Sequence, residues 1–161
     1  HAQQATIAGA ADTIDASALS DTWRDLRFDV HTVLKQIQYD YERQQYNTIV
    51  SGAMKILNAL EAAAQKTPPT GPADAAALRE GMSILVRSLY PIVPHITHAL
   101  WNELAMGRSF DGREIIDAPL PVVDEGALVK SELELVLQGA GRKEGSPNRG
   151  NVDRLRHKGL R

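Results

Sequence analysis

Apolar residues recur every three or four positions in four separate segments of the 161-residue sequence, and this spacing constrains the fold more than any other feature. In a helix with about 3.6 residues per turn such positions share one face, so each segment predicts a helix that packs on one side. The predicted helices span residues 20–43, 47–65, 74–90 and 95–104. Their apolar faces carry, in chain order, Trp23, Leu26, Val30, Val33, Leu34, Ile37 and Tyr41; Ile49, Ala53, Ile56, Leu57, Leu60 and Ala64; Leu78, Met82, Leu85, Val86 and Leu89; and Ile96, Ala99, Leu100 and Leu104.

Capping residues and prolines indicate where these helices begin and end. Ser20 or Asp21 in the first helix and Asn47 in the second are the expected N-caps, because their side-chain oxygens can accept a hydrogen bond from a free first-turn amide. The run K-T-P-P-T-G-P-A predicts a loop before the third helix, Pro91 ends that helix, and Pro94 begins the fourth. Four one-sided helices with short connections predict an all-α fold, an antiparallel bundle of about four helices.

The remainder of the chain lacks this helical periodicity. Ile115 and Ile116 predict a short extended segment, and the alternating leucines of residues 132–138 predict a half-buried strand. The sequence that follows is basic, rich in glycine and without periodicity, so we expect it to be disordered. The chain is thus expected to have four parts: a polar lead-in (1–19), a helical bundle (20–106), an exit segment with a first strand (107–138) and a disordered basic tail (139–161).

Composition and charge exclude several classes of protein. The absence of cysteine excludes disulfides, thiolate metal sites and a cysteine nucleophile, and it favours a reducing compartment. Because apolar runs are only a few residues long, we expect a soluble, cytoplasmic protein with no membrane partner. The net charge of −2 divides into about −7 for residues 1–138 and +5 for residues 139–161. An acidic body argues against strong, independent binding to nucleic acid.

Catalytic and metal-binding motifs of the common kinds do not occur in the sequence. His95 and His98 have a spacing that can place two imidazoles on one metal, but no third ligand is close in sequence. We therefore predict no metal site and assign His95, with its neighbour Trp101, to structural roles. The carboxylates that a fold could pair for acid–base catalysis are expected to be ordinary solvated groups: Asp40, Glu42 and Asp124.

Four basic residues on the polar face of the first predicted helix are the best candidates for a nucleic-acid contact: Arg24, Arg27, Lys35 and Arg43. Cations on a rigid helix can position a phosphate backbone without reading bases. Acidic residues are interspersed among them, so an ordinary mixed-charge helix surface is the alternative interpretation. The sequence shows no aromatic platform of the kind that stacks unpaired bases.

Several motifs follow one another in an order that is typical of a known family. They are R-F-D-V-H-T-V-L-K-Q-I from Arg27, E-R-Q-Q-Y-N-T-I-V-S-G-A-M-K-I-L-N from Glu42, L-Y-P-I-V-P-H-I-T-H-A-L-W-N-E-L from Leu89, I-I-D-A-P-L-P-V-V-D-E-G-A-L-V from Ile115 and E-L-V-L-Q from Glu134. With these motifs, residues 20–138 resemble the anticodon-binding helical domain of bacterial leucyl-tRNA synthetases, which are class I enzymes. After Gln138 the sequence departs from that family, so we expect a divergent, truncated or frame-shifted end.

The resemblance implies partners and a division of labour. The helical domain of such an enzyme packs on a catalytic domain and lies along a leucine-specific tRNA, chiefly contacting its backbone. The catalytic domain uses ATP and leucine, and its His-Ile-Gly-His and Lys-Met-Ser-Lys-Ser signatures do not occur here. We therefore expect this chain to be a piece of a longer ligase, with no cofactor and no activity of its own. A stand-alone helical module that binds another protein is the alternative.

Overall fold

In the computed structural model, which describes residues 3–129, every regular element is helical. The elements are α1 (Gln4–Gly9), α2 (Asp21–Glu42), α3 (Tyr46–Lys66), α4 (Pro72–Leu89), α5 (Pro94–Glu103) and the short 3₁₀ helices η1 (Met106–Phe110) and η2 (Ile115–Asp117), and residues 125–129 are also helical. The all-α class is thus confirmed for this part of the chain. The strand expected at 132–138 and the tail expected to be disordered lie outside the described residues.

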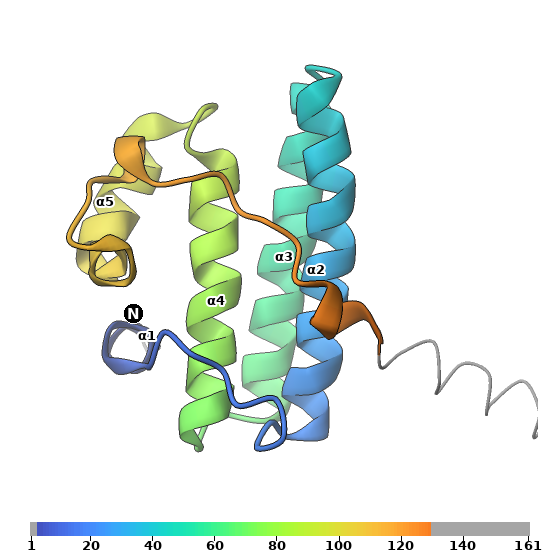
Figure 1. Cartoon of the computed structure of the whole chain (residues 1–161), viewed down its shortest axis with the longest axis vertical. Coiled ribbons are helices and arrows are strands. Elements are labelled where there is room, and N and C mark those ends of the chain that lie inside the picture. The colour runs from blue at the N-terminus through green and yellow to red at the C-terminus, as the bar shows by residue number, and fades with distance from the viewer. Residues whose placement is uncertain (1–2, 130–161) are drawn as a thin grey trace, which may run out of the picture.

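The three long helices α2, α3 and α4 lie side by side and run in alternating directions (Figure 1). Their apolar stripes face one another and form one continuous core, because each stripe covers only part of its own helix. α2 and α3 approach closely at Gly52, where a Cβ atom would lie 2.8 Å from Cγ1 of Ile37. The most deeply buried side chains between these helices are Trp23, Leu34, Ile37, Ile49 and Ile56.

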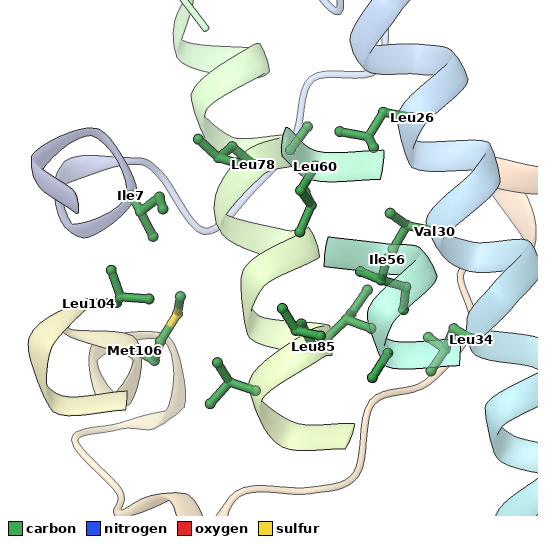
Figure 2. Packing of buried hydrophobic residues seen from close by; sticks show 14 of the residues in the cluster. Ile7, Leu26, Val30, Leu34, Ile56, Leu60, Leu78, Leu85, Leu104 and Met106 are labelled. Carbon is green, nitrogen blue, oxygen red and sulfur yellow. The ribbon is translucent and has the colours of Figure 1, made fainter. Parts of the chain in front are cut away.

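α4 is the central helix because it has core on both sides. α2 and α3 pack on one side, and α1 and α5 pack on the other (Figure 1). Figure 2 shows Val30 and Ile56 on the first side and Ile7, Leu104 and Met106 on the second. Small side chains allow this close approach at several buried positions of α4: Ala73, Ala76, Ala77, Gly81, Ser83 and Ser88. The arrangement therefore differs from a bundle of four equivalent helices.

α1 lies within the segment that the sequence indicated as a polar lead-in. Ile7 of α1 is buried against α4, and Leu19, just before α2, is buried as well. With Ile7 as its only large apolar residue, α1 shows no helical periodicity, so the sequence offered no signal for this element. α1 and Leu19 are therefore packed on the helical domain, whereas residues 15–18 between them are exposed.

Arg79 of α4 joins α1, α5 and η1 from the inside of the molecule. Its Nη1 donates to the carbonyl oxygens of Ile7 and Leu104 at 2.9 and 3.1 Å, and its Nη2 donates to Ala105 O and Ser109 Oγ at 2.9 and 2.8 Å. Its Nε donates to Asp12 Oδ1 at 2.9 Å. The C-terminal ends of two helices carry partial negative charge, so a buried cation is well placed between them.

The helices begin differently from the capping predictions. Ser20 precedes α2 as expected, but its hydroxyl donates to Asp74 Oδ2 at 3.1 Å and does not cap the helix. Asn47 lies inside α3, whose N-cap is Gln45. The turn from α2 to α3 begins one residue earlier than predicted, with Gln44 in the left-handed region at φ 56°. The apolar periodicity thus predicted which segments are helical, whereas the local turn geometry determines the residue at which each helix begins.

The face predicted for α5 is only partly buried: Leu104 is buried and Leu100 packs against the core, as expected, but the other two predicted residues are exposed. Thr97 and Trp101 are buried, while Ile96 is 61% exposed and Ala99 is exposed. Trp101 donates from Nε1 to the carbonyl oxygen of Arg113 at 3.1 Å, and its ring lies 5.3 Å from that of Phe110. The structural role assigned to Trp101 agrees with this burial. With only ten residues, α5 is too short for apolar spacing alone to fix its orientation.

The chain leaves α5 through η1 and η2 and crosses back over α4 to α2 as an irregular strap, residues 118–124 (Figure 1). Ile115 and Ile116 belong to the 3₁₀ helix η2 and are not extended, which corrects the prediction. Arg87 of α4 donates to Pro119 O at 3.0 Å, and Gln38 of α2 donates to Pro121 O at 3.0 Å. No helix between residues 3 and 129 is long and apolar enough to cross a membrane.

Candidate nucleic-acid interface

Arg27 is held by carboxylates from two other parts of the fold. Its Nε and Nη2 donate to Glu80 of α4 at 2.7 and 3.0 Å, and Nη2 also donates to Asp124 at the end of the strap. Only 12% of the Arg27 side chain is exposed. A phosphate group would have to displace two carboxylates to reach this guanidinium. Arg27 therefore links α2 to α4 and to the strap through ion pairs.

His31 lies in the same contact between α2, α4 and the strap. The backbone N–H of Asp124 donates to Nδ1 of His31 at 3.1 Å, so the ring hydrogen is placed on Nε2. Nε2 lies 3.3 Å from Oε1 of Glu80, and the His31 side chain is 2% exposed. The histidine consequently fixes the backbone at the end of the strap while facing the carboxylate that binds Arg27.

The electrostatics of this cluster keep its acids charged. Burial by itself would raise the pKa of Glu80, but the hydrogen bonds and charge of Arg27, together with the nearby His31 ring, outweigh burial, so the pKa lies below its ordinary value. The Arg27 hydrogen bond likewise lowers the pKa of Asp124. The pKa of Arg27 is raised, chiefly by its hydrogen bond to Glu80. The cluster is thus an ion-pair network at neutral pH.

Arg24 is also occupied, although less deeply. Its Nη1 donates to Asp21 Oδ1 at 2.9 Å, and its Nη2 donates to the carbonyl oxygen of Leu19 at 3.0 Å. These contacts tie Arg24 to the beginning of α2, where several acidic residues are exposed. Of the four predicted cations, Arg24 and Arg27 therefore have carboxylate partners at hydrogen-bonding distance.

Lys35 and Arg43 are the two predicted cations that face solvent. The Lys35 side chain is 66% exposed and its Nζ lies 3.9 Å from Glu125. Arg43 is exposed at the C-cap of α2, and its guanidinium carbon lies 5.1 Å from the centroid of the Tyr39 ring. Nη1 of Arg43 also donates to the Tyr39 hydroxyl. Lys35, Tyr39 and Arg43 form a row at four-residue spacing, so they share one face of the helix.

The contacts of α2 define where this row points. Val33 and Ile37 face α3, since both lie against Gly52. His31 and Gln38 face the strap. Because the remaining face of α2 has neither neighbour, it presents Lys35, Tyr39 and Arg43 to solvent, and we call these three residues the α2 row.

Two residues beside the predicted cations were missed by sequence reasoning. Lys55 is exposed on α3 and follows Gly52 by three residues, which places it near the seam between α3 and α2. Tyr39 lies off the apolar stripe of α2, and that position was the available signal for a solvent-facing aromatic ring. The exposed cations at this end of the two helices are Lys35, Arg43 and Lys55.

The carboxylates considered for acid–base chemistry have separate environments. Asp40 is buried, contrary to expectation, and accepts a hydrogen bond from Gln36 Nε2 at 2.9 Å. Glu42 is exposed, as expected, and Asp124 binds Arg27. His98 lies 3.1 Å from Glu114, and the exposed His95 side chain makes no hydrogen bond within residues 3–129. In the same residues no group of three or more histidine, aspartate or glutamate side chains is arranged to hold a metal.

Comparison with protein families matches residues 24–147 to the anticodon-binding domain of tRNA ligase. The chain belongs to this family. The match includes α2 from Arg24 onward, all of α3, α4 and α5, and the strap, so it covers both the α2 row and the cluster around Arg27. Membership in the anticodon-binding domain family agrees with the resemblance that the sequence motifs indicated.

Individual relatives of this anticodon-binding domain are leucine–tRNA ligases. The chain is 58% identical over 127 residues to that of Ralstonia nicotianae, 51% over 144 residues to that of Methylibium petroleiphilum and 46% over 143 residues to that of Polynucleobacter asymbioticus. These matches cover 79%, 89% and 89% of this chain and 14%, 15% and 16% of the respective ligases. The chain therefore spans about one seventh of the length of these relatives.

Proposed function

We propose that this chain is the helical tRNA-binding part of a leucine–tRNA ligase, and that it helps to position leucine-specific tRNA for leucylation by the longer cytoplasmic enzyme. Family membership and relatives named leucine–tRNA ligase support the proposal. The observation that carries it at the residue level is the α2 row, where Lys35 and Arg43 face solvent without a carboxylate at hydrogen-bonding distance.

The α2 row suits contact with a phosphate backbone. Lys35 and Arg43 are eight residues apart, which corresponds to about 12 Å along the helix axis. Cations fixed at such a separation can contact phosphates of one strand, and these contacts position an RNA without reading its sequence. The proposal accordingly retains Lys35 and Arg43 as the main phosphate contacts, adds Lys55, and gives Arg24 and Arg27 a supporting structural role.

Binding of leucine tRNA to this chain tests the proposal directly. The affinity is expected to be modest and to fall steeply between about 50 and 200 mM salt, because phosphate contacts release counterions. Arg43→Ala should weaken binding and reduce the slope of log affinity against log salt by about one, without changing which tRNA is preferred. Arg113→Ala provides a matched control, since Arg113 is exposed on the α5 side of α4. Equal affinity for the Arg43 variant and the parent would contradict the proposal.

The division of labour in the longer ligase follows from the same proposal. ATP and leucine are bound by a catalytic domain outside this chain, so the chain alone should not attach leucine to tRNA. The exposed apolar residues Val93 and Ile96, at the start of α5, are offered as part of the contact with the rest of the ligase. A tight protein partner unrelated to the ligase, together with no RNA binding at any salt concentration, would favour the stand-alone interaction module.

A further inference from the structure

A half-exposed aromatic ring lies between the two cations of the α2 row, and phosphate binding does not require it. Tyr39 is 49% exposed, whereas both tryptophans of the chain are fully buried in the core. The Tyr39 ring is not part of the core, because neither the core cluster nor the residues packed against it include this side chain. The ring is therefore available for contact from outside the molecule.

Tyr39 and Arg43 form one composite surface. The Arg43 guanidinium lies over the ring at 5.1 Å and donates a hydrogen bond to the ring's own hydroxyl. The two contacts orient a planar cation against an aromatic ring without any bound ligand. A preorganised pair of this kind loses little side-chain entropy when a third planar group joins it.

We propose that Tyr39 and Arg43 bind one unpaired nucleobase of the RNA by stacking, while Lys35 contacts an adjoining phosphate. This inference rests on the proposed function and adds a second mode of recognition to it. Aromatic rings and guanidinium planes stack on bases of any identity, because every base has a π face. Bases in a duplex stem are already stacked on one another, so the ligand is a nucleotide in a loop, a bulge or an end.

The charge of the α2 row favours an RNA over a protein segment as its ligand. The α2 row contains two cations, and the carboxylates near it are Glu125, 3.9 Å from Lys35, and the exposed Glu42, which directly precedes Arg43. An apolar protein segment would leave both cations of the row without partners. A single strand of RNA carries both a phosphate and a base. Lys35 and Tyr39, which would contact these two groups, are one helical turn apart, or about 6 Å along the helix axis.

Substitutions at Tyr39 test the stacking directly, with binding of this chain to a leucine-tRNA transcript as the measurement. Tyr39→Leu keeps an apolar side chain but removes the ring, and it should weaken binding about 5- to 150-fold. Tyr39→Phe keeps the ring and should stay close to the parent. Tyr46→Leu is the matched control, because Tyr46 is 51% exposed at the start of α3 and is not part of the row. Unchanged melting temperatures would show that all variants fold.

The choice of RNA separates the stacking proposal from the proposed function. An RNA hairpin with an unpaired loop should bind more tightly than a blunt duplex of equal length, and Tyr39→Leu should remove that difference. If Arg43→Ala weakens binding while Tyr39→Leu does not, the phosphate interface stands and the stacking proposal is wrong. A loss for Tyr46→Leu as large as that for Tyr39→Leu would also overturn it, as would tight binding of the row to a protein segment in place of RNA.

Discussion

Two arginines on the same helix show how burial decides what a cation can do. Arg27 is surrounded by Glu80, Asp124 and His31, so its charge is used inside the molecule. Arg43 lies beyond the last turn of α2, and its guanidinium hydrogen-bonds to the Tyr39 hydroxyl and lies over the Tyr39 ring. The same residue type therefore stabilises the fold at one position and is available to a ligand at the other.

A prediction at the residue scale concerns Arg79. Its substitution by methionine should lower the free energy of unfolding by about 3–5 kcal/mol, because it leaves Asp12 and several carbonyl oxygens without their buried partner. Urea unfolding followed by tryptophan fluorescence provides the measurement. Arg113→Met, at an exposed site, should change the value by no more than about 0.5 kcal/mol. A similar small change for Arg79→Met would contradict the role given to this side chain.

A second residue-scale prediction concerns the contact between α2 and α3. Gly52→Ala gains about 1 kcal/mol of helix propensity, but its Cβ would meet Ile37 in the core. Overpacking of this kind costs about 1–3 kcal/mol, so the variant should be less stable overall. Gly9→Ala has open space around the new methyl group and should be neutral or slightly stabilising. Thermal unfolding of both variants checks the contrast, and a stabilised Gly52→Ala would show that the two helices are not tightly packed there.

At the scale of elements, the long helices could be predicted from the sequence and the short ones could not. α2, α3 and α4 each repeat an apolar pattern over several turns, and that repetition predicted their extent and the buried faces of α2 and α3. The second buried side of α4 was not predicted, because it consists largely of small side chains. α1 has a single buried residue, Ile7, and α5 buries Thr97 and Trp101 because of contacts with η1 and the segment that follows. These contacts are made with residues outside the helices themselves, which the apolar spacing within a helix does not encode.

For the candidate site, the positions of the cations on α2 could be predicted from the sequence, but their partners could not. Placing cations on the polar face of α2 required only the helical period, and Lys35 and Arg43 are exposed as that reasoning implied. The pairing of Arg27 with Glu80 and Asp124 depends on which helix and which strap residue lie opposite. The exposure of Tyr39 beside Arg43 also emerged only with the fold.

The element-scale prediction concerns the strap at low pH. The pKa values of Glu80 and Asp124 are lowered in the folded state, so their contribution to stability is complete above their ordinary values of 4.5 and 3.8. That contribution is lost as the pH falls through the lowered values. Glu80→Gln should therefore reduce stability at neutral pH and flatten its decline with acid. Glu61→Gln, an exposed change on α3, should retain the parental pH dependence in urea unfolding. An unchanged acid profile in Glu80→Gln would contradict the ion-pair network.

At the scale of the whole molecule, the two sides of α4 have different tasks. The side with α1, α5 and η1 is organised around the buried Arg79 and stabilises the domain. The side with α2 and α3 carries the exposed cations of the α2 row, and the strap joins the two sides by binding Arg27 and His31. We therefore propose that RNA contacts one face of the α2–α3 pair. The opposite side, with α1, α5 and η1, would stabilise the domain and contact the rest of the ligase.

Amide chemical shifts of this chain, recorded with and without leucine tRNA, would locate the RNA-binding face. We expect the shifts to change along residues 35–43 and around Lys55, and the changes to fade as salt is raised. The amides of α1, α5 and η1 should change little. Changes concentrated on α1 and α5, with residues 35–43 unaffected, would show that the α2 row is not the tRNA-binding face.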